Sequence, residues 1–422
     1  MDSVSMLEDV DGLDRPQNGR LLLVTAVRLR EGQNGLQIDD QTFAGLRRWA
    51  EQFREVVFAG ILLAGGQEEE TSANWVDVAS LPCISQVRFI ALPMAYRVGA
   101  FVRTYRTCRR LLADEIRQAD HLCFTIGYLV GDWAAIAALE AMVQGRKYGV
   151  WFDRVEHEVL ARTVGKLPLK RQIKERASLL ALRPYHHYLT RHSSLALLQG
   201  MDTFGAYAPH ASNPACVYDV HTGPEDFATA ADLAVKQGEI LAGEPLRIVY
   251  AGRAAEMKGP LDWLEAIAAA LRAGAMLNAT WLGDGPLLPA MRQRVSQLGI
   301  EDHVRLRGHV ENRTDVLNEL RRAHLLLFCH KTPESPRCLI EALVSACPIV
   351  GYDSAYARGL IEDGGGHLTP INEVEGLAAT LVSLAAHREN LSQMVGKAAE
   401  VGQRFEEAKL YRERAALIAA YA

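Results

Sequence analysis

Two cations five residues apart form the first motif in the sequence that could do chemistry. Residues 252–259 read Gly-Arg-Ala-Ala-Glu-Met-Lys-Gly, so Arg253 and Lys258 follow an apolar run directly. A guanidinium fork and an ammonium point charge at the end of one strand can converge on a diphosphate. The alternative is a solvated charged turn, because this spacing is common. We favour the diphosphate interpretation.

A second motif combines two carboxylates with the predicted start of a helix. Residues 333–341 read Pro-Glu-Ser-Pro-Arg-Cys-Leu-Ile-Glu, and Ser335 as N-cap with Pro336 as first helical residue predict that start. Glu334 lies just ahead of it, and Glu341 lies inside an apolar run. Carboxylates there suit sugar and ribose hydroxyls. Otherwise Glu334 would only complement the helix dipole and Glu341 would be solvated, but an acid within an apolar run needs a partner.

The start of this helix is also a predicted anion site. The amide N–H groups of Arg337 and Cys338 are expected to point outward at the positive end of the helix, where a phosphate can bind.

Length and composition limit the class of protein. A chain of 422 residues suits two domains, or three. The net charge of -5 gives no reason to expect nucleic acid as the main partner. The seven cysteines are scattered, odd in number and without a C-x-x-C pair, which argues against zinc or a disulfide framework and for a reducing compartment.

The sequence gives no indication of a membrane span or a signal peptide. Residues 1–19 are acidic, without an apolar core or a basic start, and are predicted to form a flexible tail. No run of about 18 uncharged apolar residues is present. We therefore expect a cytoplasmic protein.

The elements that must position these motifs alternate between short apolar runs and helical patterns, which predicts βαβ units and parallel sheets. A first series begins with a strand at 20–27, a Gly-rich loop at 30–35 and a helix near 40–53. A second series begins with a strand at 246–252, after a polar, linker-like stretch at 217–238. Ligands are expected at the carboxyl ends of such strands.

The sequence lacks the motifs of two common kinds of ligand site. The Gly-Asp-Gly-Pro segment at 283–286 precedes a helix without the later glycine of G-x-G-x-x-G, which argues against a dinucleotide dehydrogenase. No D-x-D motif stands at a strand end, and Asp39-Asp40 is better interpreted as a helix cap. We expect no metal and no cofactor.

Taken together and in order, G-R-x4-K-G, LGDGP, RLRGHV and two glutamates seven positions apart, Glu334 and Glu341, at an apolar helix resemble the family-4 retaining glycosyltransferases of the GT-B fold, within the glycosyl transferases group 1. The resemblance covers residues 217–370. It implies an α/β protein of two Rossmann-like doubly wound domains facing across a cleft, with a last helix crossing back. The expected parts are the tail, an acceptor-side domain at 20–216, a nucleotide-sugar-binding domain at 217–402, and the returning helix at 403–422.

The resemblance also implies roles for individual residues. Arg253 and Lys258 would bind the donor diphosphate and stabilise the leaving group, Glu334 would hold the transferred sugar, and Glu341 the ribose. Ser335-Pro336-Arg337 replaces the Gly-rich turn usual in the family, so Arg337 is expected to supply a contact there. The other donor-binding residues implied are His309 and Val310 beside the base, and Leu339 and Cys338 beside the nucleotide.

The N-terminal half matches the family only in outline. Gly35 sits where the family places a glycine near the diphosphate, with a plain turn as the alternative. Asp153 closes a strand where relatives often place an acid or a histidine near the transferred sugar; its alternative role is to cap the next turn. Glu156 and His157 are weaker candidates. Four other histidines are expected to be structural or at the surface: His121, His186, His187 and His324.

The motifs together with the resemblance therefore imply a metal-independent, retaining hexosyltransferase that moves a sugar from a nucleoside diphosphate to a glycan or lipid-linked acceptor in cell-surface polysaccharide assembly. The alternatives are a nucleotide-sugar epimerase or hydrolase on the same fold, and a non-catalytic nucleotide-sugar-binding protein. Two basic, partly amphipathic stretches, 97–117 and 162–191, favour peripheral contact with an anionic membrane at its inner face. Solvated faces of ordinary helices are the alternative there.

Overall fold

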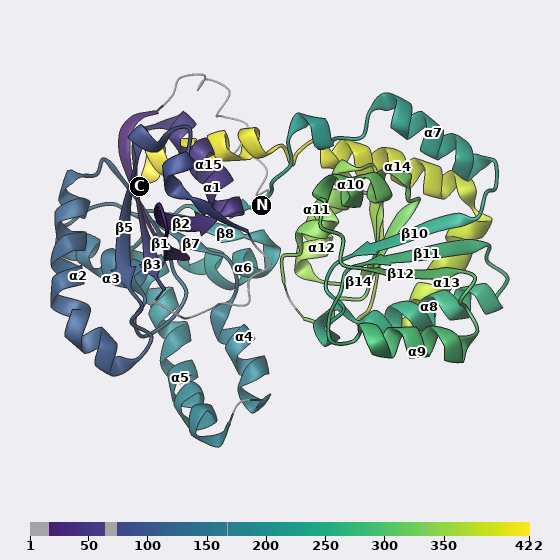
Figure 1. Ribbon diagram of the computed structural model, residues 1–422, viewed down its shortest axis with the longest axis horizontal. Helices are drawn as coiled ribbons and strands as arrows, with labels where there is room; N and C mark the ends of the chain where they lie inside the picture. Colours follow the sequence, from purple (N-terminus) through teal and green to yellow (C-terminus); the bar gives the residue numbers. More distant parts are fainter. Residues whose placement is uncertain (1–16, 64–73, 167, 333) are drawn as a thin grey trace. The chain divides into compact units, whose positions relative to one another are not determined.

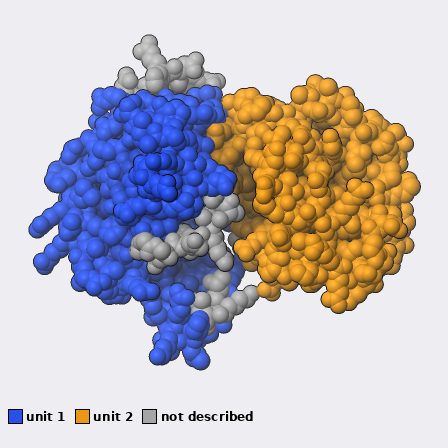
Figure 2. Space-filling view, in the orientation of Figure 1, with its two compact units in different colours: residues 1–218, 408–422 blue, residues 219–407 orange. Residues whose placement is uncertain are grey.

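The chain forms two compact units, each described here by itself (Figures 1 and 2). The computed structural model describes residues 17–63, 74–166, 168–332 and 334–422. Unit 1 comprises the chain up to Tyr218 together with Ala408–Ala422. Unit 2 comprises the intervening residues, Asp219–Glu407. Residues 1–16 of the predicted tail lie outside the described residues, whereas residues 17–19 already belong to the first strand.

Unit 1 is built on a parallel sheet whose strand order is β5-β3-β1-β6-β7-β8-β9. The chain order reverses at β1, which lies between β3 and β6, as in a doubly wound fold. The strands are β1 Gln17–Gly32, β3 Phe53–Leu62, β5 Val87–Pro93, β6 His121–Thr125, β7 Gly149–Phe152, β8 Leu195–Gln199 and β9 Pro214–Val217.

A hairpin replaces the Gly-rich loop predicted at residues 30–35. Strand β1 continues to Gly32, where it pairs antiparallel with β2 (Gly35–Asp39), and β2 pairs in turn with β4 (Trp75–Asp77). The Asn34 amide donates to Asp77 at 3.0 Å and fixes the turn to β4. Asn-Gly between strands is a strong hairpin signal, so the loop prediction was wrong.

Helices cover both faces of this sheet (Figure 1). Alternate residues of a strand point to opposite faces: Leu22 and Val24 join a core with α2 and α3, whereas Leu21 and Leu23 join a core with α1 and α15. The helices are α1 Asp40–Gln52, α2 Val98–Gln118, α3 Trp133–Val143, α4 Glu156–Thr163, α5 Leu169–His192, α6 Gly200–Tyr207 and α15 Glu407–Tyr421. Short 3-10 turns are η2 Val78–Ser80, η3 Ile84–Gln86, η4 Val164–Lys166 and η5 Ala208–His210.

The last helix, α15, belongs to unit 1 although unit 2 precedes it in the chain. The Tyr411 ring lies 5.0 Å from the Trp49 ring, and the guanidinium of Arg414 lies 5.2 Å from the Trp151 ring. The Ala422 carbonyl lies 3.0 Å from Nδ1 of His121. The helix therefore returns to unit 1, as the GT-B resemblance implies, starting at residue 407 rather than 403.

Unit 2 is a second doubly wound domain with strand order β12-β11-β10-β13-β14-β15, all parallel. Its strands are β10 Leu246–Ala251, β11 Leu277–Leu282, β12 Val304–Gly308, β13 Leu325–Phe328, β14 Ile349–Tyr352 and β15 Gly366–Thr369. Its helices are α7 Ala230–Leu241, α8 Pro260–Arg272, α9 Leu288–Leu298, α10 Arg313–Arg322, α11 Arg337–Val344, α12 Ala355–Leu360, α13 Val374–Ala386 and α14 Arg388–Gly402, with 3-10 turns η6 Pro224–Asp226 and η7 Glu256–Lys258.

The stretch 217–238, predicted to be a linker, includes most of α7. Thr229 and Asp232 form a capping box at the start of this helix. Lys236 is buried and donates to the carbonyls of Ser345 (3.0 Å) and Ala346 (2.7 Å), which follow α11. From Asp219 on, the segment is therefore a packed part of unit 2.

Candidate functional site

The two predicted motifs of unit 2 meet at the point where the strand order of its sheet reverses. Arg253 and Lys258 follow β10, and Glu334 follows β13, which is the neighbour of β10. In doubly wound folds, ligands bind outside the carboxyl ends of the strands at this switch point.

Glycines allow the loops after β10 and β11 to pack backbone against backbone. A Cβ on Gly283 would lie 2.0 Å from the Gly252 carbonyl oxygen, and one on Gly285 would lie 2.5 Å from that of Ala254. The Ala254 N–H donates to the Asp284 carbonyl at 2.9 Å. The glycines of LGDGP thus fix the position of the loop that carries Arg253.

The same loop is attached to the end of β13. Gly259 has a φ of 60°, and a Cβ there would lie 2.2 Å from the Cys329 carbonyl oxygen, so only glycine fits. The Lys331 N–H donates to the Met257 carbonyl at 2.8 Å. These contacts bring the Lys258 side chain to the segment that follows β13.

Lys258 and Glu334 form an ion pair, with Nζ 2.8 Å from Oε2. The other carboxylate oxygen of Glu334, Oε1, is buried and accepts no hydrogen bond among the described residues. Nδ1 of His330 lies 3.6 Å from it, and Nε2 of His330 lies 2.8 Å from the Tyr250 hydroxyl. Lys258, Glu334, His330 and Tyr250 thus form one connected polar network.

Burial keeps the two aromatic side chains of this network, His330 and Tyr250, neutral. The pKa of His330 is well below its ordinary value, because burial disfavours the imidazolium and Lys258 adds positive charge. The pKa of Tyr250 is well above its ordinary value, chiefly because of burial. The charge of Glu334 is therefore balanced by Lys258 and not by His330. Sequence reasoning missed Tyr250 and His330, although polar residues within or ending an apolar strand were a usable signal.

The helix after Glu334 begins one residue later than predicted. Pro336 is the N-cap with extended backbone (φ -74°, ψ 118°) and Arg337 is the first residue of α11, so the assignment of Ser335 as N-cap was wrong. Because Pro336 holds the cap position, the first amides of the helix are those of Arg337 and Cys338. Pro333 lies outside the described residues.

The remaining residues of the helix motif differ in what they can offer a ligand. The Leu339 side chain is 1% exposed and part of the core, which leaves only its backbone for a nucleotide. Burial raises the pKa of the Cys338 thiol to about 12, so it is neutral. Arg337 is half-buried, and Arg253 is exposed. Neither arginine makes a side-chain hydrogen bond or ion pair within the part of the chain that the structure describes.

Glu341 is partly exposed rather than buried in its apolar run. Its side chain is 23% exposed, and its Oε1 lies 3.6 Å from Nε of Arg313, the first residue of α10. Arg313 also binds Asp226 at 2.9 Å. Arg313 is a partner that the sequence pattern did not identify.

His309 and Val310 directly follow β12 and are exposed and half-buried, respectively. The Gly308 carbonyl just before them accepts from the Gly283 N–H at 2.7 Å. They therefore lie beside the loop after β11, at the same edge of the sheet as Lys258.

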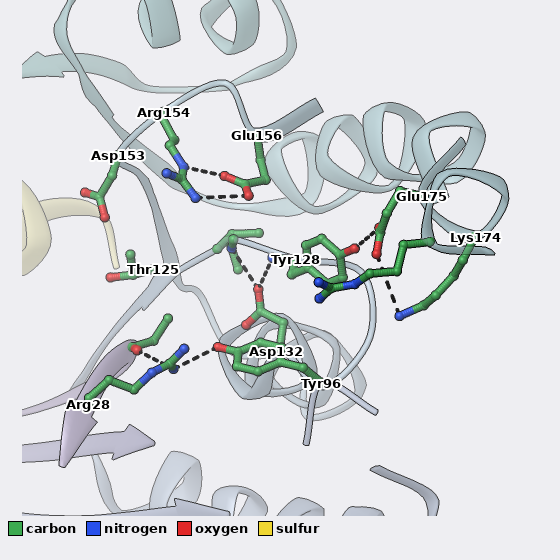
Figure 3. Close-up of a pocket in the computed structure, with 14 residues that line it drawn as sticks. Arg28, Tyr96, Thr125, Tyr128, Asp132, Asp153, Arg154, Glu156, Lys174 and Glu175 are labelled. Atoms are coloured by element: carbon green, nitrogen blue, oxygen red, sulfur yellow. Dashed lines mark hydrogen bonds and ion pairs between the residues drawn. The ribbon is translucent and has the colours of Figure 1, made fainter. Parts of the chain in front are cut away.

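Unit 1 contains a pocket of about 530 Å³ at the carboxyl ends of its strands (Figure 3). It opens at the reversal of strand order between β1 and β6, and residues after β7 and from α4 and α5 complete it. The lining residues are Ala26, Arg28, Tyr96, Thr125, Ile126, Gly127, Tyr128, Asp132, Asp153, Arg154, Glu156, Arg171, Lys174 and Glu175.

A buried carboxylate organises the loop after β6. Asp132 accepts from the N–H groups of Gly127 (2.7 Å), Tyr128 (2.9 Å), Ala134 (2.9 Å) and Ala135 (3.1 Å). It is the N-cap of α3, and burial raises its pKa against the effect of these hydrogen bonds. Its main role is to hold this wall of the pocket in place.

Two tyrosines give the pocket an aromatic wall with polar tips. The Tyr96 and Tyr128 rings meet edge to face at 6.4 Å. Arg28 donates to the Tyr96 hydroxyl at 3.2 Å, and the Tyr128 hydroxyl donates to the buried carboxylate of Glu175 (Figure 3). Aromatic rings beside carboxylates and guanidiniums can bind the faces and hydroxyls of a sugar.

Of the four candidate residues predicted in the N-terminal half, two line the pocket and two do not. Asp153 and Glu156 line the pocket, and Glu156 is paired with Arg154 (Nε to Oε2, 2.5 Å). Gly35 lies in the hairpin turn and His157 packs near Tyr207; neither is among the lining residues. Sequence reasoning missed the other charged and aromatic residues of the lining, because they come from strands, loops and helices that lie far apart in the sequence.

The remaining histidines have structural surroundings. His186 is buried with Nδ1 3.2 Å from the Tyr207 hydroxyl, and the His187 ring stacks on that of His210 at 3.8 Å. Burial lowers the pKa of His186 to about 3 and that of His187 to about 4. His324 is buried, and its Nδ1 accepts from the Arg247 N–H at 3.3 Å.

Three general observations concern the described residues. They contain no group of three or more His, Cys, Asp or Glu residues that could hold a metal ion. None of their helices is both long and apolar enough to cross a membrane. All seven cysteines are among them and are free thiols.

The architecture of each unit, taken with a comparison to solved structures, defines the class of fold. The chain resembles the crystal structure of Anabaena HepE in complex with UDP, with a TM-score of 0.63 and 14% sequence identity over 94% of this chain and 98% of that one. The fold is GT-B, composed of two Rossmann-like domains, as the sequence predicted.

Sequence comparison adds a family match for part of the chain. Residues 245–387 match the family described as Glycosyl transferases group 1, which confirms the predicted resemblance at the level of group 1. The chain is 32% identical over 140 residues to the UDP-N-acetylglucosamine–peptide N-acetylglucosaminyltransferase GtfA subunit of Streptococcus gordonii, over 31% of this chain and 26% of that protein. It is 27% identical over 183 residues to the amylovoran biosynthesis glycosyltransferase AmsK of Erwinia amylovora, over 42% of this chain and 45% of that protein. The chain thus spans less than half the length of these curated relatives.

Proposed function

We propose that this chain is a glycosyltransferase that moves a hexose or related sugar from a nucleoside diphosphate to an acceptor hydroxyl in the assembly of a cell-surface polysaccharide. The Lys258–Glu334 pair at the switch point of unit 2 carries this proposal. It places a cation for a diphosphate next to a carboxylate for a sugar. The family match of residues 245–387 and the names of the relatives GtfA and AmsK support the reaction class.

The proposed reaction needs no protein nucleophile. The acceptor hydroxyl oxygen bonds to the anomeric carbon while the bond from that carbon to the diphosphate oxygen breaks, and the acceptor proton passes to the leaving diphosphate. Attack on the same face would retain the anomeric configuration. Arg253 and Lys258 would offset the charge that develops on the diphosphate. Since two cations are available for this task, we propose that neither a metal nor a cofactor is required.

The unpaired oxygen of Glu334 suits the transferred sugar. Oε1 is buried without a hydrogen-bond donor among the described residues, and a buried acceptor left unpaired costs free energy. A hydroxyl of the donor sugar would supply the missing donor. Lys258 would at the same time exchange part of its contact with Glu334 for the diphosphate.

We further propose that the unit 1 pocket receives the acceptor, a glycan or a lipid-linked glycan. Its aromatic and carboxylate lining, with Asp153 at the end of β7, offers stacking surfaces and hydrogen-bond acceptors for sugar hydroxyls.

One turnover experiment tests the reaction class. The purified chain is incubated with a panel of nucleotide-sugars, with and without acceptor glycans and lipid extracts, and release of the nucleoside diphosphate is measured. Acceptor-dependent release supports a transferase. Equal release without acceptor indicates a hydrolase, conversion of the donor sugar to an epimer indicates an epimerase, and donor binding without turnover indicates a non-catalytic binding protein.

A further inference from the structure

Helices α4 and α5 extend from the body of unit 1 as a pair (Figure 1). The C-terminal half of α5 is anchored, with Leu182, His186 and Leu189 buried. In its N-terminal half, Leu169–Leu180, Glu175 is the buried residue. We call α4, η4 and this half of α5 the helical arm.

The arm carries an exposed apolar stripe. Leu169, Ile173 and Leu180 are 76%, 68% and 83% exposed, and Leu180 and Leu169 are the two most exposed large apolar side chains among the described residues. At about 100° per residue, their spacings of four and seven place all three on one side of α5. Each would gain free energy by leaving water.

Positive charge surrounds this stripe on a protein whose net charge is -5. Helix α5 carries six basic residues and one acidic residue, Glu175. That acid is buried, accepts from the Tyr128 hydroxyl and lies 3.8 Å from Nζ of Lys174, so it offsets one of the six cations. Arg171 and Lys174 line the unit 1 pocket, and the other four basic residues are Lys170, Arg176, Arg183 and Arg191.

The opposite side of the same helix forms a wall of the unit 1 pocket. Arg171, Lys174 and Glu175 line the pocket, and Figure 3 shows Lys174 and Glu175 on this wall. Their helical positions lie about 100–160° around α5 from Ile173, on the other side from the apolar stripe. The arm therefore has one side at the pocket and another exposed to solvent.

We propose that the helical arm docks on an anionic lipid bilayer. Leu169, Ile173 and Leu180 insert between the headgroups, and the surrounding Lys and Arg side chains bind the lipid phosphates. The pocket then opens beside the membrane surface, where it takes the polar head of a lipid-linked acceptor. This identity of the acceptor rests on the proposed function; the membrane contact itself does not.

Co-sedimentation of the full chain with vesicles tests the docking. Vesicles of phosphatidylcholine with 30% phosphatidylglycerol are compared with pure phosphatidylcholine, at low salt and at 0.5 M NaCl. The expected result is binding to the anionic vesicles that falls steeply with salt, because screening weakens each contact between a cation and a phosphate. Replacing Leu169, Ile173 and Leu180 together by Ser should weaken binding at least tenfold.

A matched variant controls for the loss of exposed apolar surface as such. Val235→Ser with Leu241→Ser removes two side chains of α7 in unit 2, which are 61% and 55% exposed, and should leave vesicle binding unchanged. Negligible binding of the wild-type chain to anionic vesicles would overturn the proposal, as would equal binding by the triple variant. A wild-type oligomer that dissociates in the triple variant, without vesicle binding, would instead make the arm a protein interface.

Donor binding separates this inference from the proposed function. The triple variant should keep its circular dichroism spectrum and its affinity for nucleoside diphosphates, because the arm lies in unit 1 and the donor site in unit 2. A chain that binds donor but no vesicles contradicts the membrane inference alone. A chain that binds vesicles but no nucleotide contradicts the proposed function and leaves the membrane docking standing.

Discussion

Nζ of Lys258 lies 2.8 Å from Oε2 of Glu334, which joins the loop after β10 to the segment after β13. In this arrangement the cation and the carboxylate that we propose for the diphosphate and the sugar would neutralise each other until a donor binds. A partly buried cation without its partner is unfavourable. The ion pair therefore keeps both side chains in place.

Removing either cation should reduce turnover much more than stability. We expect Lys258→Ala and Arg253→Ala each to lower the rate of transfer by on the order of 10²–10³, because the charge developing on the diphosphate loses one stabilising group. Transfer rates and melting temperatures are measured for both variants.

Lys397→Ala is the matched control, since Lys397 is exposed on α14 and paired only with Glu400. Activity of Lys258→Ala within about threefold of that of this control would contradict the assignment.

Glu341→Gln should weaken donor use without unfolding the chain. The side chain is 23% exposed and lies 3.6 Å from Arg313, so a neutral amide fits the same space. Loss of a hydrogen bond made by a charged group costs roughly 1.5–3 kcal/mol, or about 10- to 100-fold in donor affinity. Donor titrations of the variant and of Glu319→Gln, a partly exposed acid of α10 paired with Arg307, measure the effect. An unfolded variant, or one with wild-type affinity, would make Glu341 structural.

Stability should fall as the pH is lowered below about 6.5. Burial lowers the pKa of His186 and of His324 to about 3. An unfolded histidine binds a proton below about pH 6.5, so between pH 6.5 and 3 the unfolded chain binds more protons than the folded chain. For each of these two buried histidines, lowering the pH by one unit in this range lowers the free energy of unfolding by up to about 1.4 kcal/mol.

Urea unfolding at pH 7.5 and 5.5 measures this dependence. His186→Phe should reduce the difference between the two pH values by about 1 kcal/mol, whereas His192→Phe, at an exposed position, should not. An unchanged difference in His186→Phe would show that this histidine is not the source.

Much of the fold followed from the sequence because apolar runs of strand length are a local signal. The strand predicted at 246–252 lies within one residue of β10, and the helix predicted near 40–53 lies within one residue of α1. The hairpin at Gly35 and the helix α7 were missed, since polar turn residues and a polar helix resemble a loop when the packing partner is unknown.

The candidate site was only partly predictable for the same reason. Arg253, Lys258 and Glu334 are marked by motifs near strand ends, and their meeting follows from the order of the strands. Tyr250 and His330 join them through buried contacts that no spacing indicates. The unit 1 pocket draws its lining from six separate segments, so only Asp153 and Glu156 were named in advance.

Chelation should leave the reaction intact. With Arg253 and Lys258 available to neutralise the leaving diphosphate, EDTA at 10-fold excess over added divalent ions is expected to change the transfer rate by less than about twofold. Dialysis into EDTA followed by assay with and without Mg²⁺ or Mn²⁺ measures this. Activity that is lost in EDTA and restored by one of these ions would reveal a metal requirement.

The most direct test of the central claim is calorimetric titration of the full chain and of Lys258→Ala with a panel of nucleoside diphosphates. The account predicts that at least one, such as UDP, binds the wild-type chain at one site per chain and binds Lys258→Ala at least tenfold more weakly. Absence of binding for every member of the panel up to millimolar concentration would contradict a nucleotide-sugar site in unit 2. Equal affinity of both proteins would contradict its placement at Lys258 and Glu334.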